Sequence, residues 1–172
     1  MKIEPLRREH LRDAFDCGEP SLNRFICQQA RQFEERRIGR TFVAVEDDSL
    51  VVIGFYTLVS SNLAFMSMPD NTKLPPNMPI PTILLGRLAV GKIYQSRGSG
   101  KILLIHALLR SMEISKQIGV YAVEVDALNE DARRFYLKYG FTPLHDDIRH
   151  LYLAIKKSNR NFSLWGFEAR GW

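Results

Sequence analysis

The chain has 172 residues, a length that suits one domain with a sizeable core. Its composition, 45% hydrophobic and 25% charged residues, is ordinary for a soluble globular protein. An excess of 24 Lys and Arg over 19 Asp and Glu gives a net charge of +5, which favours a polyanion or a phosphorylated ligand as partner.

Several classes of protein are excluded by local features. Cys17 and Cys27 make neither a disulfide framework nor a CxxC metal pair, and no histidine has zinc-ligand spacing with them, so no metal is expected. The N-terminus is charged from its second residue and does not resemble a signal peptide. The longest apolar runs are too short to cross a bilayer. We therefore expect a cytoplasmic protein without a membrane segment.

The first third of the chain predicts a strand, two helices and a hairpin. Residues 1–6 indicate a short strand that enters a polar helix. Helical spacing over 21–33 places Leu22, Phe25 and Ile26 on one side, with Ser21 as N-cap. The segments 41–46 and 51–60 are typical of two strands joined by an acidic turn, which predicts a hairpin.

The middle of the chain alternates between a loop, a strand and a helix. Five prolines within 61–82 predict an irregular surface loop. The segment 82–90 is apolar almost throughout, as in the buried middle of a sheet. Residues 99–118 give the clearest helix, whose expected apolar face carries Ile102, Ile105, Leu109 and Met112.

The last third predicts a strand over 121–127 and a helix over 130–139 that stops at Gly140. Closing strands are expected at 141–144 and 150–155. The tail, about 156–172, is basic and aromatic without clear periodicity. No internal repeat or linker is visible, so the whole chain is predicted to form one domain.

A glycine-containing segment, QSRGSGK at 95–101, lies between the strand 82–90 and the helix 99–118. It does not match a P-loop, because position 95 is Gln and Ile102 follows Lys101. It does not match the GxGxxG fingerprint either, because Leu103 occupies the third glycine position. Glycines before a helix N-terminus still favour anion binding by backbone N–H groups, although a simple tight turn is an equally good interpretation of the segment alone.

The neighbouring motifs decide between these interpretations, because their order and spacing resemble the GCN5-related N-acetyltransferase (GNAT) family. The family's pyrophosphate loop, [QR]xxGx[GA], matches Gln95 to Gly100, and its second motif matches Asn129, Ala132, Phe135-Tyr136 and Gly140-Phe141. The resemblance covers about residues 83–142. It implies a single GNAT-like domain of the α/β (α+β) class over 1–172, with a mixed, mostly antiparallel central sheet flanked by helices.

The same resemblance implies that acetyl-CoA is the acetyl donor and predicts its site. The pyrophosphate would lie on backbone N–H groups of the loop, and the pantetheine arm would pair with strand 88–90 as an added strand. A backbone N–H of that strand would polarise the thioester carbonyl. The implied acetyl-CoA residues are Leu88, Ala89, Val90, Gln95, Ser96, Arg97, Gly98, Ser99, Gly100, Lys101, Asn129 and Phe135.

Tyr136 matches the family's general-acid position. A tyrosine has a pKa near 10, above the value of about 8.5 for a thiol, so proton transfer from the phenol to a departing thiolate is favourable. Tyr139, three residues later, is interpreted as a core or CoA-lining residue. Without the motif, Tyr136 itself would be interpreted as an amphipathic core tyrosine.

No general base is evident. Glu124 and Asp126 share one face of their strand and could relay a proton through water, although such residues are more often solvated or paired. A lysine amine, with a pKa of about 10.4, needs help to lose its proton, whereas an α-amine at roughly 7.7–8.0 needs little. An α-amine beside an electron-withdrawing ester should lose its proton more easily still. The acceptor is therefore expected to be an α-amine.

Two further segments, 15–45 and 75–90, resemble the GNAT toxins of type II toxin–antitoxin modules. That resemblance implies acetylation of the α-amine of aminoacyl-tRNA, a block of translation and a ribbon-helix-helix antitoxin as partner. A homodimer is left open. Candidate contacts to tRNA or the acceptor are Arg87, which lies in an apolar strand and needs a partner or a site, and Arg36, Arg37, Arg40, Arg133 and Arg134.

Two alternatives to the toxin remain. One is a GNAT enzyme that acetylates a small-molecule amine or a protein N-terminus. The other is a GNAT-fold binding module without turnover, against which the loop at 95–100 and Tyr136 argue.

Overall fold

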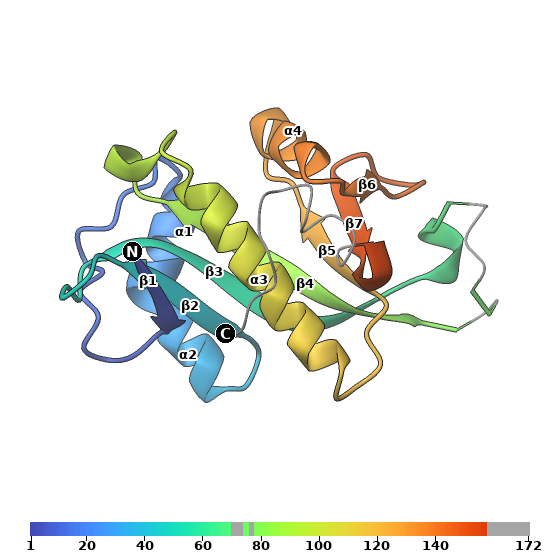
Figure 1. The fold of residues 1–172 in the computed structure, drawn as a ribbon, viewed down its shortest axis with the longest axis horizontal. Coiled ribbons are helices and arrows are strands. Elements are labelled where there is room, and N and C mark those ends of the chain that lie inside the picture. The colour runs from blue at the N-terminus through green and yellow to red at the C-terminus, as the bar shows by residue number, and fades with distance from the viewer. Residues whose placement is uncertain (70–73, 76–77, 158–172) are drawn as a thin grey trace. The chain divides into compact units, whose positions relative to one another are not determined.

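The computed structural model describes residues 1–69, 74–75 and 78–157. Its strands and helices, in chain order, are β1 (Lys2–Pro5), α1 (Pro20–Arg24), a π-helical turn (Phe25–Gln29), α2 (Ala30–Glu35), β2 (Arg40–Val45), β3 (Val52–Leu63), a short 3-10 turn (Phe65–Ser67), β4 (Ile80–Val90), a second 3-10 turn (Lys92–Tyr94), α3 (Ser99–Ser115), β5 (Ala122–Asp126), α4 (Glu130–Lys138), β6 (Thr142–Pro143) and β7 (His150–Ala154) (Figure 1). None of the described helices is long and apolar enough to span a membrane.

The strands form one mixed sheet in the order β1-β2-β3-β4-β5-β7-β6. The pairs β1–β2, β2–β3, β5–β7 and β6–β7 are antiparallel, whereas β4 and β5 are parallel. The predicted class, a mixed and mostly antiparallel sheet with helices, is confirmed. The parallel register of β4 with β5 is short and covers three residue pairs, from Thr82 with Ala122 to Leu84 with Glu124.

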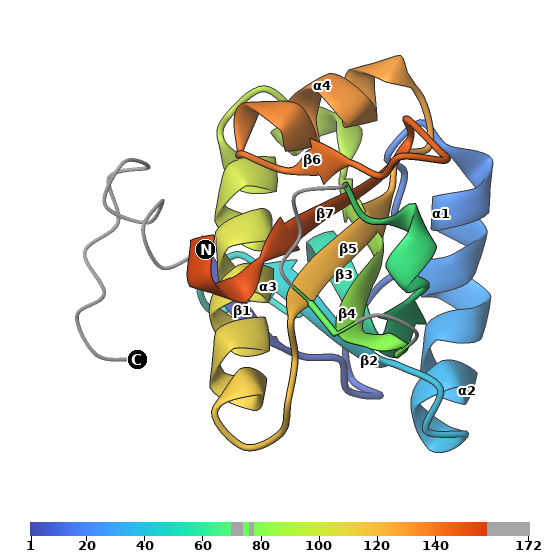
Figure 2. The same cartoon turned by 90° about the vertical axis from the view of Figure 1, so that its right-hand side faces the viewer.

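The chain divides into two compact units. The first contains Met1–Ser60 and Leu85–Leu109, and the second contains Ser61–Leu84 and the described residues from Arg110 onward. Within the first unit, α1 and α2 cover one face of strands β2 and β3, and the first half of α3 covers the other face (Figure 2). Within the second unit, α4 lies beside β6.

The core of the first unit is rich in aromatic side chains. Phe25 is fully buried and stacks on Phe55 at a ring-centroid distance of 6.0 Å, while Phe15 meets Phe55 edge-on at 5.5 Å. In the second unit, apolar and charged side chains alternate from Val123 to Asp126 in β5, and half-buried and buried residues alternate along β7. Val123 and Val125 are buried, as are Leu151 and Leu153 on the paired strand. These periodic apolar positions explain why both strands were predictable from sequence.

The helix predicted over 21–33 forms, with one irregularity. A π-helical turn at Phe25–Gln29 separates α1 from α2. The apolar side is as predicted, because Phe25, Ile26 and Ala30 are buried. The predicted N-cap is wrong: Glu19 occupies that position without a capping side chain, and the Ser21 hydroxyl donates to the Glu19 carboxylate at 3.1 Å.

Two other sequence predictions need correction, and a third lies mostly outside the described residues. No helix follows β1 before Pro20; instead the Arg7 N–H donates to His10 Nδ1 at 2.9 Å and Leu11 bridges to Val51, which hold the segment as turns. The predicted loop 61–82 is shorter, because β3 runs to Leu63 and β4 begins at Ile80. Of the basic tail, the structure describes Lys156 and Lys157, and the rest lies outside the described residues.

The predicted apolar face of α3 is also wrong in part. Ile105 is buried, but Ile102 is 40% exposed, and the buried positions include Leu103, Leu104 and Leu108. A helix buried over such a wide arc carries apolar residues on most of its circumference. Its sequence therefore has no single apolar stripe from which the buried face could be identified.

Candidate active site

The segment from Gln95 to Gly98 forms an exposed turn before α3. Ser96 and Gly98 have positive φ angles of 60° and 86°. The Ile102 N–H donates to the Gly98 carbonyl oxygen at 3.1 Å, so the helical hydrogen bonds begin there. The N–H groups before Ile102 lie in the first helical turn, where no carbonyl of the same helix can accept them. The start of α3 therefore has backbone donors that an anion could use, and the binding of an anion there stays a prediction of the sequence motif.

The side chain of Gln95 holds this turn in place. Its amide nitrogen Nε2 donates to the backbone carbonyl oxygens of Cys17 and Val90, both at 2.9 Å. These bonds fasten the turn to the end of β4 and to the segment that precedes α1. The structure thus assigns the Gln95 side chain a positioning role, whereas the sequence predicted a residue that contacts acetyl-CoA.

A second fastening joins the same two segments. Lys92 Nζ lies 2.6 Å from Asp16 Oδ2, and the Lys92 N–H donates to the Asp16 carbonyl oxygen at 2.8 Å. The other carboxylate oxygen accepts from the Gly18 N–H and from the Asn23 side chain. The hydrogen bond from Lys92, followed by that from Gly18, lowers the pKa of Asp16 to about 2. Sequence reasoning missed this ion pair, because its two members are 76 residues apart.

The last residues of β4 lie beyond the β4–β5 register, which ends at Leu84. They include the predicted pantetheine strand, in which Ala89 and Val90 are buried and Leu88 is half-buried. Gly54 of β3 approaches this strand closely: a Cβ at that position would lie 3.1 Å from the Ala89 carbonyl oxygen and 2.9 Å from Leu103 Cδ1. A glycine at position 54 thus allows β3, β4 and the start of α3 to pack together.

Arg87 of β4, just before the segment 88–90, lies against two aromatic rings. Its guanidinium carbon lies 3.8 Å from the ring centroid of Phe25 and 5.1 Å from that of Phe33. Burial lowers its pKa, although an arginine stays charged at neutral pH. Across the described residues Arg87 forms neither an ion pair nor a hydrogen bond, so the buried ion pair considered from sequence is not seen. The two rings hold a cation whose N–H donors can bind another molecule.

In the second unit, α4 carries the predicted general acid. Asn129 caps the helix, since its Oδ1 accepts from the Ala132 N–H at 2.9 Å. Tyr136 is 7% exposed, and its ring lies 5.3 Å from that of Phe135 and 5.4 Å from that of Phe141. Burial raises the pKa of Tyr136, so the phenol keeps its proton at physiological pH. Its hydroxyl forms no hydrogen bond within the described part of the chain.

The other predicted arginines differ in what they contact. Arg40 lies 3.5 Å from Glu34, Arg133 lies 3.0 Å from Glu130 and Arg134 lies 2.5 Å from Asp131. Arg133 is anchored further by a bond from its Nε to the Ile148 carbonyl oxygen. Arg36 and Arg37 are exposed, and no ion pair engages them within the described ranges. Within the described ranges, these two arginines are therefore available to bind a phosphate without first breaking an ion pair.

Glu124 of β5 is buried and paired, as one of the two sequence interpretations had it. Thr82 donates to its Oε1 at 2.5 Å, and His150 Nε2 lies 2.6 Å from its Oε2. The other ring nitrogen of His150 lies 3.6 Å from Asp126 Oδ1. The sequence did not point to His150. An antiparallel register between β5 and the strand at 150–155, which places Asp126 opposite His150, is the signal that could have found it.

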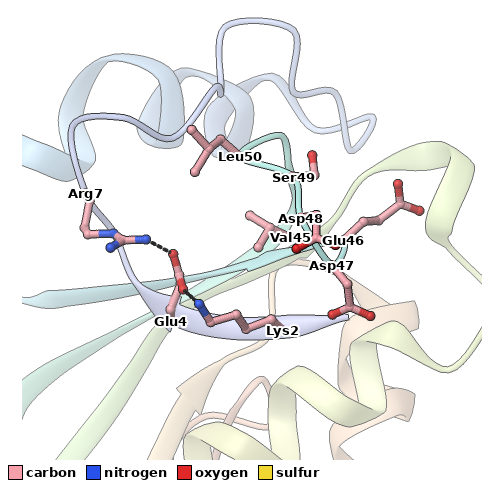
Figure 3. Close-up of a pocket in the computed structure, with 9 residues that line it drawn as sticks. All are labelled: Lys2, Glu4, Arg7, Val45, Glu46, Asp47, Asp48, Ser49 and Leu50. Carbon is pink, nitrogen blue, oxygen red and sulfur yellow. Dashed lines mark hydrogen bonds and ion pairs between the residues drawn. The ribbon is translucent and has the colours of Figure 1, made fainter.

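The predicted residues fall in both units. The first contains Arg36, Arg37, Arg40, Arg87 and the segments 88–90 and 95–101, and the second contains Asn129 and 133–136. The first unit also has a different pocket of about 320 Å³. Figure 3 shows the residues that line it, among which Glu4 is paired with Lys2 and Arg7. None of the predicted site residues lines this pocket. Among the described residues, no group of three or more His, Cys, Asp and Glu side chains could hold a metal ion.

Comparison with known proteins identifies the family to which this geometry belongs. Residues 37–143 match the family model described as an acetyltransferase (GNAT) domain. The chain belongs to the GNAT acetyltransferase family. In this chain the exposed turn and first helical turn at 95–101 follow β4, and the Phe135–Tyr136 pair lies on α4.

The relatives of this GNAT chain include toxins. A protein of Mycobacterium tuberculosis (strain ATCC 25618 / H37Rv), named tRNA-acetylating toxin, is 36% identical over 143 residues, which are 83% of this chain and 85% of the relative. A solved structure of a tyrosine-to-phenylalanine mutant of KacT matches with a TM-score of 0.88 and 32% identity, covering 94% of this chain and 98% of KacT. AtaT complexed with acetyl-methionyl-tRNAfMet matches with a TM-score of 0.86 and 30% identity, covering 94% and 98%.

Other solved structures similar to this chain show AtaT with its antitoxin AtaR, the AtaTR complex with acetyl-CoA, and toxin–antitoxin complexes with DNA. Their sequences are 29% to 31% identical to this chain.

Proposed function

We propose that the protein is the toxin of a type II toxin–antitoxin module. It transfers the acetyl group of acetyl-CoA to the α-amino group of aminoacyl-tRNA and so blocks translation in the cytoplasm. The observation that carries the donor half of this proposal is the turn at 95–98, which has positive φ angles at Ser96 and Gly98 and leads into the N-terminus of α3. The acceptor half is supported by the relative named tRNA-acetylating toxin and by the AtaT complex with acetylated tRNA.

On the donor side, backbone N–H groups of Arg97 to Lys101 hold the pyrophosphate, and the side chains of Arg97 and Lys101 add positive charge. The pantetheine arm pairs with Leu88 to Val90, because these residues lie beyond the β4–β5 register. A backbone N–H of this segment then polarises the thioester carbonyl as a preorganised donor. Asn129 and Phe135 of the second unit are further proposed acetyl-CoA residues, which rest on the family motif.

Tyr136 is the proposed general acid. Its buried phenol stays protonated, and its pKa exceeds that of a thiol, so a proton passes readily to the sulfur of the departing coenzyme. Solved relatives include tyrosine-to-phenylalanine mutants of KacT and AtaT, which is consistent with an important tyrosine in this family of toxins.

On the acceptor side, Arg87 binds a phosphate or carbonyl oxygen near the aminoacyl end of the tRNA. Its guanidinium lies over Phe25 and near Phe33, and a guanidinium has five N–H donors that another molecule can use. Arg36, Arg37 and Arg40 contact phosphates further along the tRNA, as do Arg133 and Arg134 once their helical carboxylate partners are displaced.

An antitoxin is the proposed protein partner, since AtaT forms a solved complex with the antitoxin AtaR. We propose a ribbon-helix-helix fold for it, because toxin–antitoxin complexes of this kind are seen on DNA. A homodimeric toxin is part of the same proposal, and light scattering of the purified chain tests it.

The deciding experiment is in vitro translation with and without acetyl-CoA, followed by mass analysis of the aminoacyl-tRNA pool. We expect translation to stop only when the protein and acetyl-CoA are both present, with acetylated aminoacyl-tRNA in the stopped reaction. Unmodified tRNA together with acetylation of a small amine or a peptide N-terminus would replace the toxin with the alternative GNAT function.

A further inference from the structure

Three strands of the second unit bring together a buried polar cluster that the proposed reaction does not yet use. Thr82 of β4, Glu124 of β5 and His150 of β7 are linked through the two oxygens of the Glu124 carboxylate, at 2.5 Å and 2.6 Å. The Glu124 side chain is 2% exposed. A carboxylate in such a place is costly unless it is hydrogen-bonded and paired, so its partners are required for stability.

The cluster leads from the interior to solvent. The exposed fraction of the side chains rises from 2% at Glu124 to 24% at His150 and 70% at Asp126. Glu124 is also the last residue of β5 in the register with β4. The cluster therefore begins where the parallel pairing of these two strands ends and finishes at the surface.

The geometry fixes how His150 can act. With a proton on Nε2 the ring donates to Glu124, which leaves the lone pair of Nδ1 as an acceptor on the side of Asp126. Asp126 Oδ1 is 3.6 Å from Nδ1, and an ionised carboxylate has no proton to donate to that lone pair. General-base histidines use this arrangement, in which one ring nitrogen donates to a carboxylate and the other can accept a proton.

We propose that the Glu124–His150 pair accepts the proton that the acceptor α-ammonium loses before acetyl transfer, through His150 Nδ1 directly or across one water molecule. This proposal rests on the proposed function, because that function makes the acceptor an α-amine. It supplies the general base that the sequence did not reveal. Glu124 holds the ring in the correct tautomer, and both carboxylates stabilise the imidazolium that forms.

An N–H bond of the ammonium breaks, its electron pair stays on nitrogen, and the proton forms an N–H bond at His150 Nδ1. The neutral amine attacks the thioester carbonyl, and the C–S bond breaks with its electrons on sulfur. Tyr136 protonates the thiolate and regains a proton from the nitrogen that becomes the amide. One net proton remains on His150 and leaves to solvent past Asp126.

Other charged groups near the ring belong to the loop before β7. Asp146 interacts electrostatically with His150 and His145, and a hydrogen bond from Ser67 is the main cause of its lowered pKa. Glu124 and Asp126 are the carboxylates that lie against the ring nitrogens.

The test is the pH dependence of acetyl transfer to charged tRNA by the wild type, His150→Gln and Glu124→Gln, with the affinity for acetyl-CoA measured by calorimetry. At pH 7 an α-amine with a pKa of roughly 7.7–8.0 is mostly protonated, whereas at pH 9 most of it is neutral and needs no base. We expect both variants to lose about 10²-fold in kcat/KM at pH 7. The deficit should shrink about fivefold or more by pH 9, with the affinity for acetyl-CoA unchanged.

A deficit of equal size at both pH values, or no deficit, overturns the proposal, because a merely structural pair would not restore activity at higher pH. Glu113→Gln, the same substitution at an exposed position, is the matched control and should retain wild-type rates. If Glu124→Gln fails to fold, the more exposed His150→Gln carries the test. Wild-type activity on a peptide N-terminus but not on charged tRNA refutes the toxin function alone, and the pH comparison on the peptide then decides the role of the pair.

Discussion

The side-chain amide of Gln95 donates a hydrogen bond to the backbone carbonyl oxygen of Cys17, 78 residues earlier in the chain. A second bond from the same nitrogen reaches the Val90 carbonyl oxygen. The side chain of the glutamine that begins the proposed pyrophosphate loop therefore binds the backbone of its own chain. The shape of the loop depends on the segment that precedes α1.

Gln95→Ala removes both bonds from an exposed turn. Each is worth about 1 kcal/mol, so we expect acetyl-CoA to bind about tenfold more weakly and the melting temperature to fall by a few degrees. Isothermal titration calorimetry measures the affinity. Gln117→Ala, at an exposed position near the end of α3, is the control, and an unchanged affinity in Gln95→Ala would refute the positioning role.

Tyr136→Phe removes the proposed general acid and leaves the ring in its aromatic cluster. We expect kcat to fall by about 10²–10⁴-fold, with acetyl-CoA still bound and the fold intact. Release of coenzyme A thiol under saturating substrates measures the rate. Tyr139→Phe, on the same helix, should keep most of the activity, and a Tyr136→Phe enzyme with a normal rate would contradict the assignment.

Arg87→Lys keeps a positive charge but loses the planar guanidinium that lies over the Phe25 ring and near the Phe33 ring. A cation–π contact of this kind is worth about 1–2 kcal/mol, so the KM for the acceptor should rise about tenfold while acetyl-CoA affinity stays the same. Steady-state kinetics with charged tRNA measures both constants. The exposed Arg24→Lys is the control, and equal KM values in the two variants would argue against acceptor binding by Arg87.

Gly54→Ala tests the close packing of β3 against β4 and α3. The added methyl group would lie 2.9 Å from Leu103 Cδ1 and 3.1 Å from the Ala89 carbonyl oxygen. We expect a loss of about 1–3 kcal/mol in the free energy of unfolding, measured by urea denaturation. Gly119→Ala is the matched control, since a Cβ there meets no atom within 4 Å. Equal stability of the two variants would show that β3 can move aside.

Glu4 links pH to stability in the first unit. Hydrogen bonds, chiefly from Lys2 and also from His10 and Arg7, lower its pKa from 4.5 to about 2. A carboxyl group with a lowered pKa stabilises the folded state above its unfolded pKa, and this contribution is lost as pH falls from 4.5 towards 2. Glu4→Gln should therefore lower the melting temperature by about 2–4 °C at pH 7 and by less at pH 3. Scanning calorimetry measures the gap, with the exposed Glu9→Gln as control; a gap independent of pH would contradict the pairing.

The sequence was informative wherever a residue's role depends on its close neighbours in the chain. The alternation of Val123 and Val125 with Glu124 and Asp126 in β5 and the stop of α4 at Gly140 are local patterns, and both appear as expected. The donor loop was likewise recognisable, because its positive φ angles and its helix start lie within seven residues.

What could not be predicted depends on long-range register. Phe25 and Phe33 lie under Arg87, and His150 lies against Glu124, only because particular strands and helices meet at particular offsets. Proline content alone also misplaced the start of β4, since Pro81 is exposed and remains compatible with a strand.

The π-helical turn at Phe25–Gln29 has a consequence for insertions and deletions. A π turn accommodates one extra residue, so Phe25 and Phe33, eight positions apart, lie on one face as if they were seven apart in a regular α-helix, about 20° from alignment. Deleting the exposed Gln28 would convert the segment to an uninterrupted α-helix and leave both rings beneath Arg87. Deleting a residue from α2 instead would turn Phe33 away by about 100°. A one-residue deletion is thus tolerated in the π-helical turn, whereas the same deletion before Phe33 in α2 disrupts the packing of Phe33 beneath Arg87.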